Sequence, residues 1–440
     1  MSKLSRREFG KLAAAAGAGI AATPLVSTFA IAQARPRVVI VGGGAGGATV
    51  AHLVKSGAPN LDVTLIEPNP VYSSSFFSNL YLGGFRTLES LSHGYGGLRG
   101  LGIGIVQSLA TDVDTARKTV RTRSGRRFPY DRLVLSPGID IKFDSIPGYS
   151  PAAALVLPHA YTTDAGQKRL LMLQLRAMRD GGTVVMTVPG NPFRCPPGPY
   201  ERACMIAHFL KTRKPRSKFV ILDAKRSFSK QPVFIEAFGR HYKDIIELNL
   251  SNEIDDFSVV RVDAKTKEIV TKAGKNLRAD VGNIIPPQRA GEIAARTGVT
   301  DGDWAPVNPE SFASRKATDV YVLGDAAIAA EMPKSAFSAN SQAKVVAADI
   351  LAVLANKDKF EPRFRNTCWS LLAPNDDVKI GANYTPKDGK LEPSGSFVSQ
   401  PGEPDDVRRQ NYLESVAWYD NITTEMFAKR GPPPAAGKKG

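Results

Sequence analysis

The stretch RVVIVGGGAGGATVAHLVKSG, residues 37–57, decides the fold because glycines join a β-strand to a helix within it. The β-branched run Arg37–Val41 predicts a buried parallel strand. The apolar periodicity that follows predicts a helix to about Val54. Between them lie the three glycines of the pattern G-x-G-x-x-G, which are Gly42, Gly44 and Gly47. This order of elements is typical of a dinucleotide-binding unit.

An acidic residue completes the pattern. The next predicted strand, DVTLIE, ends in Glu67, 20 residues after Gly47, and a carboxylate at this spacing binds the adenosine ribose. Gly42 is expected to make the turn, Gly44 to let the backbone approach a pyrophosphate, and Gly47 to pack the helix on the strand. The pyrophosphate would lie at the helix N-terminus.

A second half-site lies far downstream, in VYVLGDAAIAAEMPKSAFSANSQAK. A strand over 320–323 ends in Gly324 and Asp325, and a long helix is expected from Ser335 or Ala336. A carboxylate at Asp325 can bind the ribitol of FAD, the helix directs its positive end at the flavin pyrimidine, and Lys334 would add charge. Two half-sites at opposite ends of the chain favour FAD over NAD, although Asp325 taken alone also fits a turn aspartate.

The middle of the chain repeats the strand and helix outline without the glycine pattern. Its first loop reads PGNPFRCPPGPYERAC, with prolines at 192, 196, 197 and 199. Proline has no N–H to offer a pyrophosphate. We therefore expect this second unit to have lost its nicotinamide site.

The chain has only three cysteines. Cys195 precedes a proline, so an extended backbone is expected, and it lies before a helix predicted from about Pro199, where a thiolate is stabilised. Cys204 falls among apolar helix residues and is interpreted as buried and inert. In an oxidising compartment Cys195 and Cys368 form the economical pair, but spacing does not fix connectivity. A redox pair and a merely stabilising bridge both remain open.

The segment SRREFGKLAAAAGAGIAATPLVSTFAIAQA, with Arg6 and Arg7, predicts a twin-arginine signal peptide over residues 1–34 and export to a bacterial periplasm. A membrane anchor is the alternative, but the stretch is weakly hydrophobic and contains Pro24. No other segment is apolar enough to span, so stable membrane insertion is not expected. The net charge of +16 comes without a nucleic-acid motif. It favours an acidic protein partner or an anionic substrate and not nucleic acid.

Several long motifs, VVIVGGGAGGAT, YDRLVLSPGI, PFRCPPGPYERA, VLGDAAIAAEMPKSAFSANSQAK and NTCWSLLAP, resemble the flavoprotein subunit of flavocytochrome c sulfide dehydrogenase from about Pro36 almost to the C-terminus. The resemblance implies an α/β, glutathione-reductase-like fold with two Rossmann-like dinucleotide-binding-type domains and a C-terminal interface domain. It also implies a periplasmic enzyme that oxidises sulfide at a cysteine pair beside FAD and passes electrons to a separate c-type cytochrome subunit.

Carried over to this chain, the redox disulfide falls on Cys195 and Cys368, and the acid/base falls on Glu201, which also fits a plain first-turn glutamate. Family members often attach FAD through a cysteine, whereas the run SSFFSN, residues 74–79, places Ser75 there. Serine has no sulfur for a thioether, so FAD is expected to be non-covalent. The predicted FAD-binding residues are Gly42, Gly44, Gly47, Glu67, Ser75, Asn79, Gly324, Asp325 and Lys334.

The expected function is oxidation of sulfide to sulfur or polysulfide, with electrons leaving to a partner cytochrome because the chain has no C-x-x-C-H haem motif. The alternatives are a sulfide:quinone oxidoreductase and a non-catalytic flavoprotein partner of a periplasmic thiosulfate-oxidising system. No histidine pairs at metal-ligand spacing, so no metal is expected, and His93 is interpreted as a packing residue. The expected division places the FAD domain at 36–150 and 286–355, the degenerate second domain at 151–285, the interface domain at 356–420 and a disordered tail at 421–440.

Overall fold

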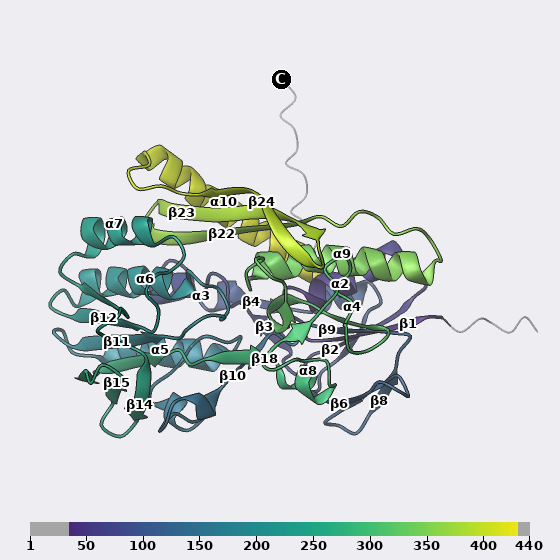
Figure 1. The fold of residues 1–440 in the computed structure, drawn as a ribbon, viewed down its shortest axis with the longest axis horizontal. Helices are drawn as coiled ribbons and strands as arrows, with labels where there is room; N and C mark the ends of the chain where they lie inside the picture. Colours follow the sequence, from purple (N-terminus) through teal and green to yellow (C-terminus); the bar gives the residue numbers. More distant parts are fainter. Residues whose placement is uncertain (1–34, 430–440) are drawn as a thin grey trace, which may run out of the picture. The chain divides into compact units, whose positions relative to one another are not determined.

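The first sheet of the molecule is parallel and has the order β20-β9-β1-β2-β5. The computed structural model of the chain describes residues 35–429 (Figure 1), so the predicted signal peptide lies outside the described residues. The strands of this first sheet are β1 (Arg37–Val41), β2 (Asp62–Ile66), β5 (Gly104–Val106), β9 (Arg132–Leu135) and β20 (Val320–Val322). β1 matches its predicted bounds, and helix α2 (Gly47–Gly57) follows the glycine turn.

The second sheet is also parallel, in the order β13-β12-β11-β17. Its strands are β11 (Thr183–Val188), β12 (Lys218–Asp223), β13 (Ile246–Leu250) and β17 (Val281–Ile284). Its helices are α5 (Ala165–Ala177), α6 (Gly198–Arg213) and α7 (Gln231–Tyr242). β11, α6 and β12 repeat the strand, loop and helix order of β1, α2 and β2, as the sequence predicts.

A C-terminal antiparallel sheet joins the two halves. It consists of β22 (Phe364–Ala373), β23 (Asp376–Lys387) and β24 (Lys390–Val398). β22 contacts both α9 (Ala336–Leu354) of the first half and α6 of the second, so it lies across the two nucleotide-type units (Figure 1). The α/β class, with two nucleotide-type units and a C-terminal interface unit, is confirmed.

The predicted disordered tail is wrong for its first residues. Helix α10 (Asp405–Phe427) continues past residue 420, because Ile422, Met426 and Phe427 are buried in the core of the first half. Residues 430–440 lie outside the described part of the chain.

Smaller elements complete the fold. They are β3 (Val71–Ser73), α3 (Ser78–Leu82), β4 (Ser92–Gly94), α4 (Gly96–Gly100), β6 (Ala110–Asp114), β7 (Thr119–Thr122), β8 (Arg127–Pro129), β10 (Ile139–Ile141), β14 (Val259–Asp263), β15 (Glu268–Thr271), β16 (Asn276–Arg278), β18 (Gln288–Ala290), α8 (Glu292–Arg296), β19 (Ala305–Pro306) and β21 (Ala327–Ile328). The short 3-10 turn Gly324–Ala326 follows β20 and carries the second half-site.

Candidate active site

The glycine loop after β1 packs too tightly for any other residue. Gly42 has φ +98°, and a Cβ there would lie 2.2 Å from the carbonyl oxygen of Ser136. A Cβ on Gly47 would lie 1.9 Å from the carbonyl oxygen of Gly42. The loop therefore brings bare backbone to a cavity that its residues 42–46 line, and Gly47 packs the helix against the turn, as predicted.

Glu67 is held against this loop. One of its carboxylate oxygens accepts the N–H of Gly43 at 2.9 Å, and the other accepts the N–H of Asn69 at 2.9 Å. These bonds fix the carboxylate on the wall of the same cavity. The position suits the ribose-binding role that the sequence predicts for it.

The second half-site faces the same cavity. Gly324 has φ +74°, and burial raises the pKa of Asp325, although the charge of Arg194 acts the other way. The Oδ1 atom of Asp325 is buried without a hydrogen-bond partner, and so is Oγ of Ser75 across the cavity wall. Buried polar atoms normally have a hydrogen-bond partner. Two such atoms without a partner in one cavity therefore indicate a polar ligand. With the glycine loop and Glu67, they fit FAD, whose hydroxyl groups would pair them.

The FAD-binding role predicted for Lys334 stays a prediction, although its charge acts on Asp325 and favours a lower pKa of that carboxyl. Its ammonium group donates to the carbonyl oxygens of Asp325 and Ala327, both at 2.8 Å, and lies 3.8 Å from the ring centre of Trp304. It therefore does not line the cavity. Its own carbonyl oxygen instead accepts the N–H of Cys195 at 2.8 Å.

Cys195 is not extended, contrary to the sequence expectation. Its φ is +56°, a left-handed conformation that non-glycine residues rarely adopt. The surrounding hydrogen bonds explain the difference, because its N–H is donated to Lys334 and its carbonyl oxygen accepts the Gly198 N–H at 2.8 Å and the Tyr161 hydroxyl at 3.1 Å. The turn aims the thiol into the cavity just before α6 begins at Gly198.

The fold brings Cys368, on β22, to Cys195, although 173 residues separate them. The two cysteines are not joined in a disulfide in this structure, and their thiols lie close enough for each to shift the pKa of the other. This contact, followed by burial, raises the pKa of Cys195. The same contact lowers the pKa of Cys368 against the effect of burial, and the Lys230 charge adds to the lowering. In the dithiol form, Cys368 is therefore the more acidic of the two cysteines.

Glu201 lies in the first turn of α6 and lines the cavity with both thiols. Its carboxylate accepts the side-chain amide of Asn79 at 2.7 Å and the N–H of Leu371 at 3.0 Å. Burial raises its pKa against these hydrogen bonds, which favours the protonated form of this carboxyl over that of an exposed glutamate. The carbonyl oxygen of the Asn79 amide accepts Nε of the buried Arg202 at 3.1 Å. Asn79, predicted to bind FAD, thus orients Glu201.

Two residues of this site were missed from the sequence. Lys230 is 4% exposed, and its ammonium group donates to the carbonyl of Cys368 at 3.2 Å, to Oγ of Ser370 at 2.8 Å and to the carbonyl of Val378 at 3.3 Å. Asp377 accepts the N–H of Ser370 at 2.9 Å, and burial raises its pKa to about 8. Nothing in the local pattern around Lys230 marks it, because only the tertiary fold brings α7 to β22.

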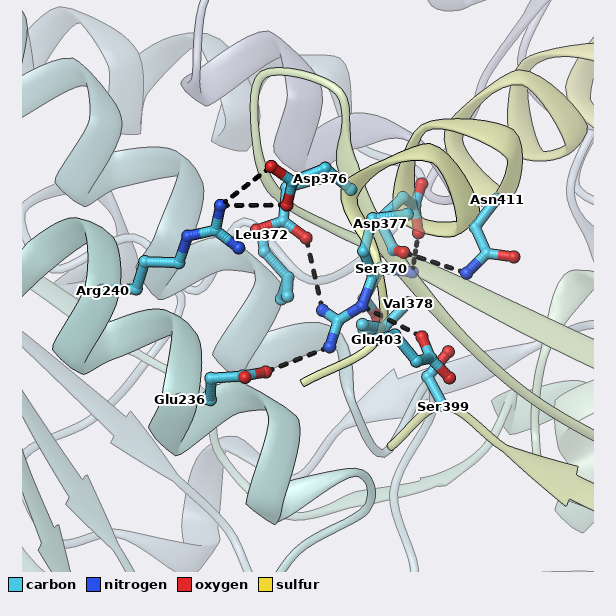
Figure 2. Close-up of polar contacts among 12 residues, drawn as sticks. Glu236, Arg240, Ser370, Leu372, Asp376, Asp377, Val378, Ser399, Glu403 and Asn411 are labelled. Atoms are coloured by element: carbon cyan, nitrogen blue, oxygen red, sulfur yellow. Dashed lines mark hydrogen bonds and ion pairs between the residues drawn. The ribbon is translucent and has the colours of Figure 1, made fainter. Parts of the chain in front are cut away.

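Figure 2 shows the polar contacts that fasten this part of the interface unit. The side chain of Asn411, on α10, donates to the carbonyl oxygen of Asp377. Close by, Arg408 of α10 forms ion pairs that tie α7 and β23 together, with Glu236, Asp376 and Glu403. These contacts fasten β23, the strand that pairs with the Cys368 strand β22, to α7 and α10.

Aromatic side chains form one wall of the cavity, and the sequence did not single them out. Phe337 and Trp418 stack at 5.8 Å with an interplanar angle of 9°, and Trp369 lies 5.4 Å from Trp418. All three line the cavity, together with Phe76. Such a wall suits a large planar ligand and excludes water.

The cavity therefore gathers most of the predicted site. Its lining includes Gly42, Gly44, Glu67, Ser75, Asn79, Cys195, Glu201, Gly324, Asp325 and Cys368. Cys204 is fully buried and lies off the cavity, as predicted. His93 is a packing residue, as predicted, and bonds the Tyr419 hydroxyl at 2.9 Å.

Within residues 35–429, no three His, Cys, Asp or Glu side chains gather as a metal site. In that same part of the chain, no helix has the length and apolarity needed to cross a bilayer.

Three family models match the chain. The pyridine nucleotide-disulphide oxidoreductase model covers residues 36–185, so the fold and the cavity define a flavoprotein of that superfamily. Within it, the model of the central part of the sulfide dehydrogenase (flavocytochrome c) flavoprotein chain matches 168–286. The model of its flavin-binding part matches 360–427. The chain thus carries the domains of the flavocytochrome c sulfide dehydrogenase flavoprotein family, and these domains indicate FAD binding.

Curated relatives include sulfide:quinone oxidoreductases and a flavocytochrome c flavoprotein chain. The sulfide-quinone reductase of Aquifex aeolicus is 25% identical over 352 residues, which cover 75% of this chain and 80% of that protein. The mitochondrial sulfide:quinone oxidoreductase of Mus musculus is 23% identical over 297 residues, 66% of this chain and 65% of the mouse protein. The sulfide dehydrogenase (flavocytochrome c) flavoprotein chain of Chlorobaculum thiosulfatiphilum is 46% identical over 43 residues, 10% of this chain and 90% of that sequence.

Solved structures share the fold. The sulfide:quinone oxidoreductase of Aquifex aeolicus has a TM-score of 0.70 at 18% identity and covers 90% of this chain and 93% of its own. A ferredoxin reductase from Rhodopseudomonas palustris has a TM-score of 0.61 at 18% identity, over 79% of this chain and 82% of its own.

Proposed function

We propose that this chain is a periplasmic flavoprotein that oxidises sulfide at the Cys195–Cys368 pair, with FAD in the cavity, and that it passes electrons to a c-type cytochrome subunit. The observation that carries the proposal is that both sulfurs and Glu201 line the same cavity as the glycine loop and Asp325. Sequence segments more than 300 residues apart in the chain therefore build one site.

The chemistry begins from the disulfide form of the pair. Hydrosulfide attacks Sγ of Cys368, the S–S bond breaks, and Cys195 leaves as a thiolate while Cys368 keeps the new sulfur as a persulfide. Lys230 stabilises negative charge at the Cys368 end. Glu201, whose pKa burial raises, takes up or returns a proton beside Cys195. FAD, held by the glycine loop, Glu67 and Asp325, supplies a two-electron acceptor when bound.

Partner and location follow from sequence features. The twin-arginine pattern at Arg6 and Arg7 supports export to the periplasm. The chain contains no C-x-x-C-H motif, which supports a haem on a separate subunit. The excess of basic residues suits an acidic partner surface.

Anaerobic mixing with sulfide, followed by flavin absorbance with and without added cytochrome c, tests the proposal. We expect sulfide to bleach the flavin absorbance. Added cytochrome c should restore the absorbance of the oxidised flavin while the cytochrome haem is reduced. A flavin that sulfide leaves oxidised would overturn the proposal and would favour a non-catalytic partner of a thiosulfate-oxidising system.

Quinone reduction is the second candidate, because several relatives bear sulfide:quinone oxidoreductase names. The aromatic wall of Phe337, Trp369 and Trp418 also suits a planar ring. Adding decylubiquinone to the sulfide-reduced protein distinguishes a quinone acceptor from a cytochrome c acceptor. Faster reoxidation by the quinone than by cytochrome c would assign the quinone as acceptor.

The attachment of FAD is a separate part of the proposal. Ser75 lines the cavity with an unpartnered hydroxyl, so we propose non-covalent FAD in this chain. Acid precipitation should release all flavin from the native protein into the supernatant. The variant Ser75→Cys should retain yellow, fluorescent flavin on the precipitated chain. Flavin that stays with the native precipitate would contradict the non-covalent site.

A further inference from the structure

Asp377, on β23, is a buried carboxyl group at the flavin cavity for which the proposed reaction has no role. Its side chain lines the cavity, and the residue is 2% exposed. One of its carboxylate oxygens accepts the Ser370 N–H at 2.9 Å (Figure 2). The neighbouring Asp376 pairs with Arg408 and His241. In the described part of the chain, by contrast, no Lys, Arg or His nitrogen lies within 4.0 Å of the Asp377 carboxylate. A buried carboxylate without a paired cation is costly, which favours a proton on Asp377.

Lys230 is the buried cation whose charge acts on Asp377, but it donates its protons to neutral acceptors. An ammonium group has three N–H donors. Those of Lys230 are directed at the carbonyl oxygens of Cys368 and Val378 and at the Ser370 hydroxyl. No carboxylate in direct contact therefore offsets the Lys230 charge, and this charge acts on every acidic group around it. These groups are Cys368, Asp377, Glu201 and Cys195.

The two carboxyl groups of this cluster differ in how well their charged forms are stabilised. Glu201, on α6, accepts hydrogen bonds from the Asn79 amide and the Leu371 N–H, and the buried Arg202 cation also favours its charged form.

The surroundings of Asp377 do less for a negative charge. From β22 and α10 it faces the Ser370 N–H and the Ser415 hydroxyl, which are both uncharged, and Lys230 is the single cation that acts on it. Burial raises the pKa of Asp377 to about 8 against the Lys230 charge, and the negative charge of Glu201 adds to the rise. One buried cation does not stabilise several buried anions at once, so the proton belongs on Asp377 and the charge on Glu201.

We propose that Asp377 is a neutral carboxylic acid in the dithiol form of the protein at neutral pH, and that it is a positioning residue whose bound proton leaves the Lys230 charge to Cys368. An ionised Asp377 would offset part of the Lys230 charge and make Cys368 less acidic. By linkage, a negative charge on Cys368 holds the proton on Asp377. The role at Cys368 rests on the proposed function, whereas the protonation state of Asp377 does not.

Infrared pH-difference spectra of the anaerobic, FAD-loaded protein, kept in the dithiol form by a dithiol reductant, test the protonation state. Heavy-carbon labelling of aspartate carboxyls shifts the aspartic acid carbonyl band and leaves the flavin and glutamate bands in place. We expect an aspartic acid band at neutral pH that is lost as the pH rises through about 8, because Asp377 then loses its proton. Asp377→Asn should remove the band, and the matched variant Asp376→Asn should keep it. A labelled native protein without the band, or a band that persists in Asp377→Asn, would overturn the proposal.

The midpoint pH of the same band tests the charge on Glu201. Glu201→Gln removes a negative charge that raises the pKa of Asp377, so the midpoint should move to lower pH. An unmoved midpoint would overturn the assignment of the negative charge to Glu201.

The coupling to Cys368 is tested from both sides. Cys368→Ser cannot carry the thiolate charge, so the midpoint of the Asp377 band should move to lower pH, whereas Cys204→Ala, off the cavity, should leave it in place. An unmoved midpoint in Cys368→Ser would refute the positioning role. Conversely, Asp377→Asn replaces one neutral group by another, so alkylation of Cys368 by iodoacetamide at neutral pH should stay within about twofold of the native rate. A rise by on the order of tenfold would mean that Asp377 is ionised in the native protein. Neither readout requires sulfide or flavin reduction, so a failure here is distinct from a failure of the proposed oxidation.

Discussion

Two loops occupy the same position in the two nucleotide-type units but differ in what their backbone N–H groups bind. The loop at 42–47, after β1, consists of five glycines and Ala45, and its residues 42–46 line a cavity. The loop at 189–197, after β11, donates the Arg194 N–H to the Gln288 side chain at 2.9 Å and the Cys195 N–H to Lys334. A strand, loop and helix unit can therefore hold either an anionic phosphate or a thiol. It can hold a phosphate where the loop N–H groups are free, and not where they already donate hydrogen bonds within the protein.

The largest test of this comparison removes the thiol that the second loop holds. In Cys195→Ser, a hydroxyl cannot form the disulfide, so sulfide-dependent flavin reduction should fall by on the order of 10³-fold or more. FAD should stay bound because its residues lie on the other loop. Stopped-flow absorbance measures the rate, and the flavin-to-protein ratio measures the binding.

Cys204→Ala provides the matched control, because Cys204 is buried on α6 and lies off the cavity. We expect its rate to stay close to that of the native protein. Undiminished reduction in Cys195→Ser would remove the cysteine pair from the reaction.

The next test adds a side-chain atom to the glycine loop after β1. In Gly47→Ala the new Cβ would lie 1.9 Å from the carbonyl oxygen of Gly42, so the turn must open. We expect most of the FAD to be lost and the free energy of unfolding to fall by about 1 to 3 kcal/mol. The flavin content after gel filtration and a denaturant titration measure the two effects.

Gly100→Ala is the control for this change. A Cβ there meets nothing within 4 Å, so flavin content and stability should stay near native values. If Gly47→Ala bound FAD normally, the glycine loop would not be the cofactor cradle.

Local sequence patterns predicted the two loops because their chemistry is carried by neighbouring residues. The strand bounds of β1, the start of α6 and the acid at Glu67 depend on residues within one strand, loop and helix unit. The predicted conformation of Cys195 was wrong because two hydrogen bonds to residues distant in sequence override the preference that a following proline imposes. The Cys195 N–H donates to the Lys334 carbonyl oxygen, and the Tyr161 hydroxyl donates to the Cys195 carbonyl oxygen.

The same reasoning explains what was missed around the cysteine pair. Lys230 and Asp377 reach it only because β22 crosses both halves. The contacts of the Lys334 ammonium group with two carbonyl oxygens and the indole ring of Trp304 were also not foreseen, because the local sequence does not show them. The Cys195–Cys368 contact itself needed the family resemblance, since spacing left the pairing open.

The test with the smallest expected effect concerns the positive charge of Lys230 beside Cys368. In Lys230→Met the buried cation that helps lower the pKa of Cys368 is lost, so the pKa should rise and less thiolate should be present at any given pH. The pH profile of Cys368 alkylation in the reduced protein should therefore move to higher pH.

Lys225→Met is the control, since Lys225 is also a largely buried cation but pairs with Asp223 at 2.6 Å away from the cavity. Its loss should leave the profile in place, even if stability falls. A profile that moved equally in both variants would mean that general loosening, and not the Lys230 charge, sets the reactivity of Cys368. A profile that moved only in Lys230→Met would show that the thiol-holding loop works together with a cation supplied from α7, whereas the glycine loop relies on its own backbone.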